Sequence, residues 1–155
     1  MRYLIALLAV AGIVVSSLAL HVHNMDPAQA PPCAVDQNWD CGAVNHSRFA
    51  EFPPVPAGED PRAWPGHRIP IAAIGIVGYA LIGIFALLGK RFTTMELAQM
   101  GLACALGLSY VEKFILERWC IYCVWSQWII AVIAVLTIVD VWRWRRRIGL
   151  WLESK

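Results

Sequence analysis

The sequence predicts an all-α integral membrane protein, a bundle of four transmembrane helices with a long extracytoplasmic loop that contains a short helix. Three observations support this fold class. Of the 155 residues, 59% are hydrophobic and 15% are charged, whereas about 25% of the residues in a soluble domain are charged. The apolar residues form four long runs, and most polar residues lie between the first two. A soluble core of this size could not bury so much apolar surface, so we expect one membrane-embedded domain over residues 1–155.

Each apolar run approaches or exceeds the length that crosses a bilayer, which takes about 20 residues of helix. The expected spans are residues 3–20, 69–89, 95–116 and 120–142. Glu112 and Lys113 lie near the end of the third run, and we expect them in the headgroup zone. Ser17 and Ala19 resemble the small-residue cleavage site of a secretory signal peptide. An uncleaved helix is the simpler interpretation because three further runs follow.

The basic residues predict the orientation, because short cytoplasmic segments are enriched in Lys and Arg. With four spans, one side of the membrane receives Arg2, Lys90, Arg91, Arg143, Arg145, Arg146 and Arg147. We therefore expect both termini in the cytoplasm and the loop of residues 21–68 outside. The net charge of +2 gives no indication of nucleic-acid binding.

The outer loop is proline-rich at both ends, which predicts extended chain there. Between the prolines, a short helix is expected within residues 41–52. The four histidines lie in the loop or at its edges. His21 and His23 have a spacing that a metal could use, but interface histidines are usually solvated, and we predict no metal site.

Four of the five cysteines fall on the predicted outer side, where disulfides persist. Cys120 and Cys123 form a C-x-x-C pair at the start of the last span, where the helix dipole favours a thiolate. The pair is interpreted as redox-active, with a static disulfide or half of a zinc site as alternatives. Cys33 and Cys41 form either a structural disulfide within the loop or a second redox-active dithiol. Cys104, inside the third span, is expected to be a small packing residue.

The ordered set of motifs resembles the vitamin K epoxide reductase family, especially its bacterial members. The segment CGAVNHSRFA, which starts at Cys41, resembles the stretch after the family's second loop cysteine, including a serine that matches Ser47. The segment IPIAAIGIVGY, which starts at Ile69, resembles the opening of the second helix. The C-x-x-C at Cys120 and Cys123 matches the redox centre.

This resemblance implies a helical bundle around a quinone pocket, in the inner membrane of a bacterium. Cys123 would lie next to the quinone, which would be ubiquinone or menaquinone, and Cys120 would be its partner. Cys41 would exchange with Cys120, and Cys33 would meet a thioredoxin-fold partner of the DsbA type outside the cytoplasm. The chain ends at Lys155, so we expect that partner to be a separate protein. The net result would be disulfide formation in exported proteins.

The same resemblance and the aromatic content together give a set of expected quinone-binding residues, Cys123, Ser47, Phe49, Ile71, Gly75, Trp125 and Gln127. Two of them depart from the vertebrate pattern. Ile71 stands where vertebrate members have an asparagine that contacts the quinone, and Gln127 stands where they have a tyrosine. Reduction of a plain quinone is therefore a better expectation than epoxide chemistry.

Three alternatives accompany this hypothesis. One is a vitamin K quinone or epoxide reductase proper. Another is an oxidase of the DsbB type, although that type has the C-x-x-C in the first outer loop, the reverse of the order here. The last is a non-enzymatic membrane scaffold with structural disulfides, in which a change at Cys123 would affect folding but no electron step.

Overall fold

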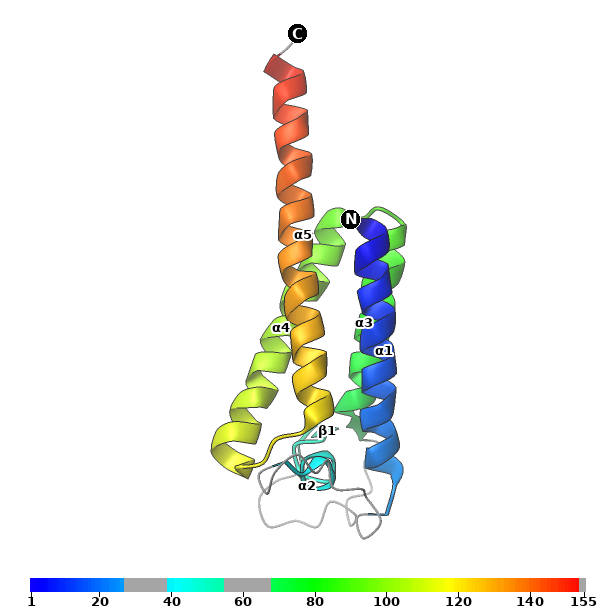
Figure 1. The fold of residues 1–155 in the computed structure, drawn as a ribbon, viewed down its shortest axis with the longest axis vertical. Coiled ribbons are helices and arrows are strands. Elements are labelled where there is room, and N and C mark those ends of the chain that lie inside the picture. The colour runs from blue at the N-terminus through cyan, green and yellow to red at the C-terminus, as the bar shows by residue number, and fades with distance from the viewer. Residues whose placement is uncertain (27–38, 55–67, 154–155) are drawn as a thin grey trace.

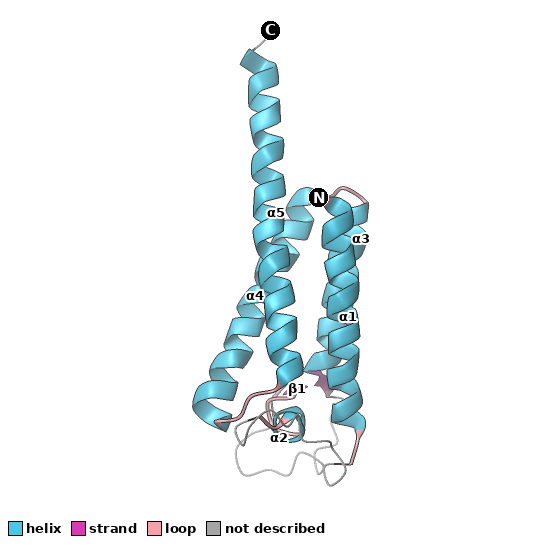
Figure 2. Ribbon diagram, in the orientation of Figure 1, coloured by secondary structure: helices cyan, strands magenta, loops and turns pink. Residues whose placement is uncertain are grey.

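The computed structural model describes residues 1–26, 39–54 and 68–153. Its long helices are α1 (Arg2–Asn24), α3 (Ile71–Leu87), α4 (Arg91–Val111) and α5 (Ile121–Glu153). The short elements are α2 (Cys41–Asn45), β1 (Glu51–Phe52), β2 (Ile69–Pro70) and the π-helical turn η1 (Glu112–Leu116). The long helices pack side by side, with α2 and β1 at one end (Figure 1). Almost all of the regular structure is helical (Figure 2), which confirms the prediction of a mostly helical protein.

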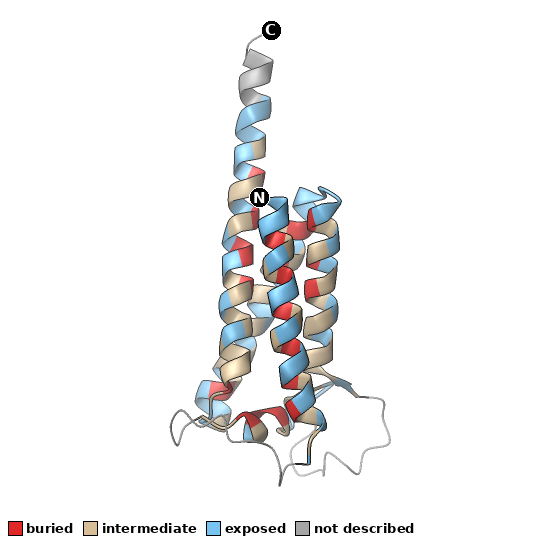
Figure 3. Cartoon of the chain, turned by 45° about the vertical axis from the view of Figure 1, so that its right-hand side comes forward, coloured by how far each residue is buried: buried red, intermediate tan, exposed pale blue. Residues whose placement is uncertain are grey.

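Two of the helices are long and apolar enough to cross a membrane, α1 and the Ile121–Ile148 part of α5. Only 28% of the apolar window of α1 and 22% of that of α5 is buried. The buried residues of α1 form a narrow stripe (Figure 3). The remaining apolar surface faces outward, as expected for helices that contact lipid. A third helix, α3, is apolar but shorter.

The helix ends differ from the predicted spans for local reasons. Helix α3 begins at Ile71 because Ile69 and Pro70 pair in an antiparallel ladder with β1. It ends at a turn in which Gly89 takes a left-handed φ of +73°, a conformation that glycine adopts without strain. Helix α5 continues to Glu153, well past the predicted end of its span. The basic residues after Trp142 end the apolar run but favour helix.

The expected loop helix is also shorter than residues 41–52, because α2 ends at Asn45. The Asp40 side chain caps its start and accepts a hydrogen bond from the Ala43 N–H at 2.8 Å. At its end, the side chains of Asn45 and His46 bond back to backbone carbonyls within the helix. Such local bonds compete with continuation of a helix.

The His46 side chain connects α2 to the end of α1. One ring nitrogen lies 2.8 Å from the carbonyl oxygen of Gly42, and the other lies 3.0 Å from that of Met25. A neutral imidazole has one N–H and satisfies one of these carbonyls, whereas the cationic form satisfies both. The His23 ring stacks on His46 at 6.0 Å between centroids, and its Nε2 lies 3.6 Å from a Glu51 carboxylate oxygen. These contacts hold α2 and β1 against the bundle.

Tyr79 joins three of the long helices. Its ring lies against Gly12 of α1, where a Cβ atom would come within 2.5 Å of the ring carbons. Its hydroxyl donates to the carbonyl oxygen of Ser126 in α5 at 2.7 Å. The ring belongs to the main apolar core, which also contains Ile5, Ala9, Ile82, Ala86, Ala98, Ile130, Ile133 and Ala134. Tyr79 therefore fixes the spacing of α1, α3 and α5 beside the site described below.

The close approach at Gly12 predicts a stability effect. In Gly12→Ala, the added methyl group overlaps the Tyr79 ring, so we expect a loss of about 1–3 kcal/mol of unfolding free energy. Thermal unfolding of the purified protein in detergent measures the change. Gly107→Ala is the matched control, because a Cβ there meets nothing within 4 Å. Equal unfolding temperatures for the two variants would contradict this account of the packing.

Candidate active site

Backbone pairing brings two distant cysteines together. The Asp40 N–H donates to the carbonyl oxygen of Trp119 at 3.0 Å, and Trp39 and Trp119 form an isolated parallel bridge. Cys41 and Cys120 follow directly on these two segments. Each is 0% exposed, and both belong to one apolar cluster. The start of α2 is thus packed against the start of α5.

Cys123 lies in the first turn of α5, and Cys120 directly precedes this helix. The Val124 N–H donates to the Cys120 carbonyl oxygen at 3.1 Å, and the two thiols interact with each other. Both are free thiols, whereas Cys41 is disulfide-bonded. The N-terminus of a helix favours negative charge, so this position suits a thiolate, which is the form that attacks disulfides.

Two polar side chains contact this pair. The Asn45 amide nitrogen donates to the Cys41 carbonyl oxygen at 2.8 Å and lies 3.5 Å from the Cys120 sulfur. A carboxylate oxygen of Glu112 accepts from the Cys120 N–H at 3.4 Å. The same carboxyl group also interacts with the Cys123 thiol. Asn45 is 7% exposed and Glu112 is 3% exposed, so both polar groups are held inside the protein beside the sulfurs.

A cavity of about 310 Å³ lies beside the cysteine pair. Its wall is mostly apolar and is built from α1, α2, α3, α4, η1 and α5. Cys123 is part of this wall, whereas Cys41 and Cys120 are not among the described residues that line it. The wall includes Ile74 of α3 and Met100 of α4, which are 45% and 65% exposed. The cavity therefore reaches the outer surface of the bundle between α3 and α4.

Most of the residues expected to bind quinone line this cavity. Ser47 and Phe49 enter it from the segment after α2, Ile71 and Gly75 from the start of α3, and Cys123 from α5. These positions are far apart in the sequence, so the fold brings together what the motifs indicated separately.

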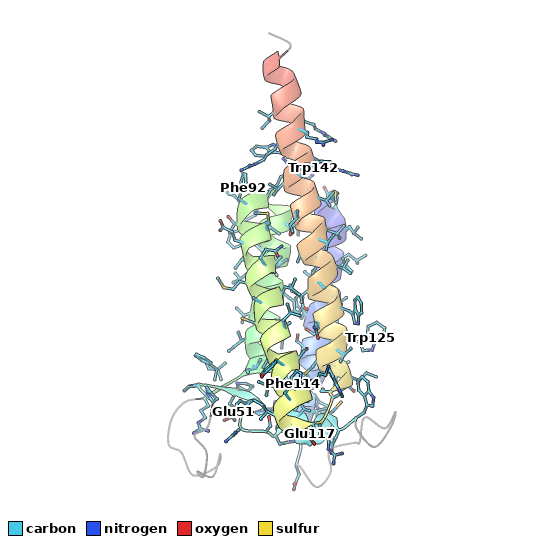
Figure 4. The ribbon with its side chains drawn as sticks, turned by 90° about the vertical axis from the view of Figure 1, so that its left-hand side faces the viewer. Glu51, Phe92, Phe114, Glu117, Trp125 and Trp142 are labelled. Carbon is cyan, nitrogen blue, oxygen red and sulfur yellow. The ribbon has the colours of Figure 1, made fainter. Side chains whose placement is uncertain are left out.

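Trp125 and Gln127 do not line the cavity. Trp125 is 59% exposed and points away from the bundle (Figure 4), because residues two apart on a helix face different sides. Gln127 shares a helix face with Cys123, but its side-chain oxygen accepts a hydrogen bond from Ser109 of α4. Neither position agrees with the expected contact to the quinone ring.

Glu112 and Asn45 were not among the site residues expected from the sequence. Glu112 was expected in the headgroup zone, and its side chain is buried inside the protein and lines the cavity. An acidic residue within an apolar run is by itself a signal of function, and that signal could have identified it. Asn45 lies in the quoted CGAVNHSRFA segment, but only the fold shows that its amide reaches a sulfur.

The other cysteines have different surroundings. Cys104 is a free thiol that is exposed and lines the cavity, so it is not a buried packing residue as expected. Cys33 lies outside the described residues. In the described part of the chain, no three His, Cys, Asp or Glu side chains gather as metal ligands would.

A search of curated proteins found no significant match to this chain. The sequence model of the Vitamin K epoxide reductase family matches residues 3–138, a range that contains all five cysteines. Proteins of this family are embedded in membranes and oxidise thiols with quinone as the electron partner. The match covers most of the chain and every element around the cavity, and the protein therefore belongs to the vitamin K epoxide reductase family.

Proposed function

We propose that this protein is a membrane thiol:quinone oxidoreductase that oxidises a thioredoxin-fold protein of the DsbA type outside the cytoplasm. Electrons pass through two cysteine pairs, Cys33–Cys41 and Cys120–Cys123, to quinone, and the reaction supports disulfide formation. One observation carries this proposal. Cys120 is buried beside Cys41, whereas Cys123 lines the cavity, so the C-x-x-C pair faces both an electron donor and an acceptor site.

The cavity suits the ring of ubiquinone or menaquinone. Pockets for small molecules are mostly apolar and have volumes of about 300–1,000 Å³, and this one has about 310 Å³. The Phe49 side chain and the small Gly75 suit a flat apolar ring, and the Ser47 hydroxyl is a donor for a ring oxygen. The opening between α3 and α4 allows entry from the hydrocarbon of the membrane.

The thiol steps balance as two exchanges. The partner's dithiol reduces Cys33–Cys41 and leaves with a disulfide. The Cys41 thiolate then attacks Cys120 of the Cys120–Cys123 disulfide, which forms a Cys41–Cys120 bond and releases Cys123 as a thiolate. Cys33 attacks Cys41, restores the loop disulfide and releases Cys120.

The last step regenerates the C-x-x-C disulfide. The Cys120–Cys123 dithiol gives two electrons and two protons to the quinone in the cavity, and a sulfur–sulfur bond forms. Cys123 is the sulfur that meets the substrate because it lines the cavity. We favour a plain quinone over an epoxide because Ile71, on the cavity wall, offers no hydrogen bond there.

The proposed topology has four spans with both termini in the cytoplasm of a bacterial cell. The N-terminus and the C-terminal half of α5 lie at the end of the bundle opposite α2 (Figure 1). The turn between α3 and α4 also lies at that end, and Arg91 from it pairs with Asp140 of α5 at 3.0 Å. The basic residues therefore gather at one end of the bundle, as expected for a cytoplasmic face.

The role of Cys123 is tested with purified protein, a reduced thioredoxin-fold protein and ubiquinone. We expect Cys123→Ser to lower quinone reduction to the uncatalysed rate, because serine cannot form the disulfide that supplies the electrons. The absorbance change of the quinone measures the rate. Cys104→Ser removes another thiol of the cavity wall and is expected to change the apparent KM at most. Normal turnover by Cys123→Ser would refute the assignment. A wild-type protein that reduces no quinone, with a Cys123→Ser variant that only loses stability, would favour a scaffold.

The role of Cys120 is tested by trapping its bond to the loop. Cys33→Ser combined with Cys123→Ser leaves Cys41 and Cys120 as neighbours in one buried cluster. We expect mild oxidation to join them, and peptide mass spectrometry identifies the bond. The matched control combines Cys33→Ser with Cys120→Ser, and it should yield no comparable Cys41–Cys123 bond. The reverse preference would exchange the roles of Cys120 and Cys123.

A further inference from the structure

The carboxyl group of Glu112 lies where a proton must move if the proposed function is correct. Its oxygen accepts from the Cys120 N–H at 3.4 Å, it interacts with the Cys123 thiol, and Glu112 and Cys123 are both part of the cavity wall. Glu112 is 3% exposed, and no ion pair among the described residues includes it. A buried carboxyl group without a charged partner is costly to keep in place for packing alone.

The backbone explains how an acid near the end of an apolar run comes to face inward. Helix α4 ends at Val111, and residues Glu112–Leu116 form the π-helical turn η1. A π-turn adds a residue to the helical repeat and is frequent at functional sites. Here the Arg118 N–H donates to the Glu112 carbonyl oxygen at 3.1 Å, which closes the turn. The neighbouring Lys113 stays exposed, with its ammonium over the Phe114 ring.

We propose that Glu112 is a catalytic residue that takes the proton of the Cys123 thiol and passes it to an oxygen of the bound quinone. This inference rests on the proposed function and adds a proton path to it. The Cys123 sulfur gives up its proton to the carboxylate as its electrons leave and its bond to Cys120 forms. The second proton, from the Cys120 thiol, follows through the same carboxyl group, which ends in its starting state.

Two other titratable groups near the cavity, Tyr79 and His23, are engaged elsewhere. The Tyr79 hydroxyl donates to the Ser126 carbonyl oxygen at 2.7 Å, and the His23 ring contacts the Asn45 carbonyl oxygen and Glu51. Cys104 and Tyr122 also line the wall. Of the groups described, Glu112 is the one carboxyl that contacts both residues of the C-x-x-C pair.

Glu112 could also have a purely structural role, because its oxygen accepts a hydrogen bond from the Cys120 N–H. That role predicts a different result for the Glu112→Gln variant than proton transfer does. Glu112→Gln keeps an oxygen that can accept this bond but cannot take up the proton. If Glu112 only positions Cys120, the variant should work almost normally. If it moves protons, quinone reduction should fall by about 10²–10⁴-fold, the usual contribution of general acid–base catalysis. Glu112→Asp keeps the carboxyl group and should retain part of the activity.

The experiment compares Glu112→Gln, Glu112→Asp and wild type as full chains in lipid nanodiscs with ubiquinone. Glu96→Gln is the control, since Glu96 is an exposed acid of α4. The single-turnover oxidation of the thioredoxin-fold partner should stay unchanged in Glu112→Gln, because that exchange precedes the proton step. Equal quinone reduction by Glu112→Gln and wild type would overturn the inference. Absence of quinone reduction in wild type would instead overturn the proposed function.

A second readout needs no quinone. In a Cys120→Ser background, the alkylation rate of Cys123 is followed against pH. We expect two steps in the profile when Glu112 is present, because two interacting groups titrate together, and one step in Glu112→Gln. Identical profiles would contradict the coupling even if Glu112→Gln were too unstable for turnover measurements.

Discussion

The packing of the start of α2 against the start of α5 is the constraint on which the rest of the site depends. It rests on few atoms, chiefly the Asp40 N–H bond to the Trp119 carbonyl oxygen and the burial of Cys41 against Cys120. Hydrogen bonds and apolar contacts of this kind exclude water from the sulfurs. They also bury Cys120 in one cluster with Cys41, and Cys123 packs against the edge of that cluster.

The geometry of a single helical turn then separates the two halves of the proposed reaction. Cys120 is buried in one cluster with Cys41, and Cys123 is part of the cavity wall. The bundle supports this division because Tyr79 holds α1, α3 and α5 together next to the cavity. Tyr79 and Glu112 both line the cavity. The residue that sets the helix spacing and the residue proposed to move protons therefore share one cavity wall.

The sequence was sufficient for features that depend on local composition. Apolar runs predicted the long helices, and the spacing of Cys120 and Cys123 placed the pair at the start of α5. Features that depend on a change of helical repeat were not predictable. The π-turn at Glu112 rotates the carboxyl group inward, and hydropathy carries no signal for such a turn. Trp125 lies two residues from Cys123 on the same helix, so its side chain faces away from the cavity.

The central claim is the order in which electrons move, from Cys41 to Cys120 and from Cys123 to quinone. The most direct measurement is a pulse of ubiquinone given to the fully reduced protein, followed by rapid alkylation and mass spectrometry of each cysteine. The account predicts that Cys120 and Cys123 lose their free thiols first and that Cys41 follows. Oxidation of Cys41 before or without Cys123 would contradict it.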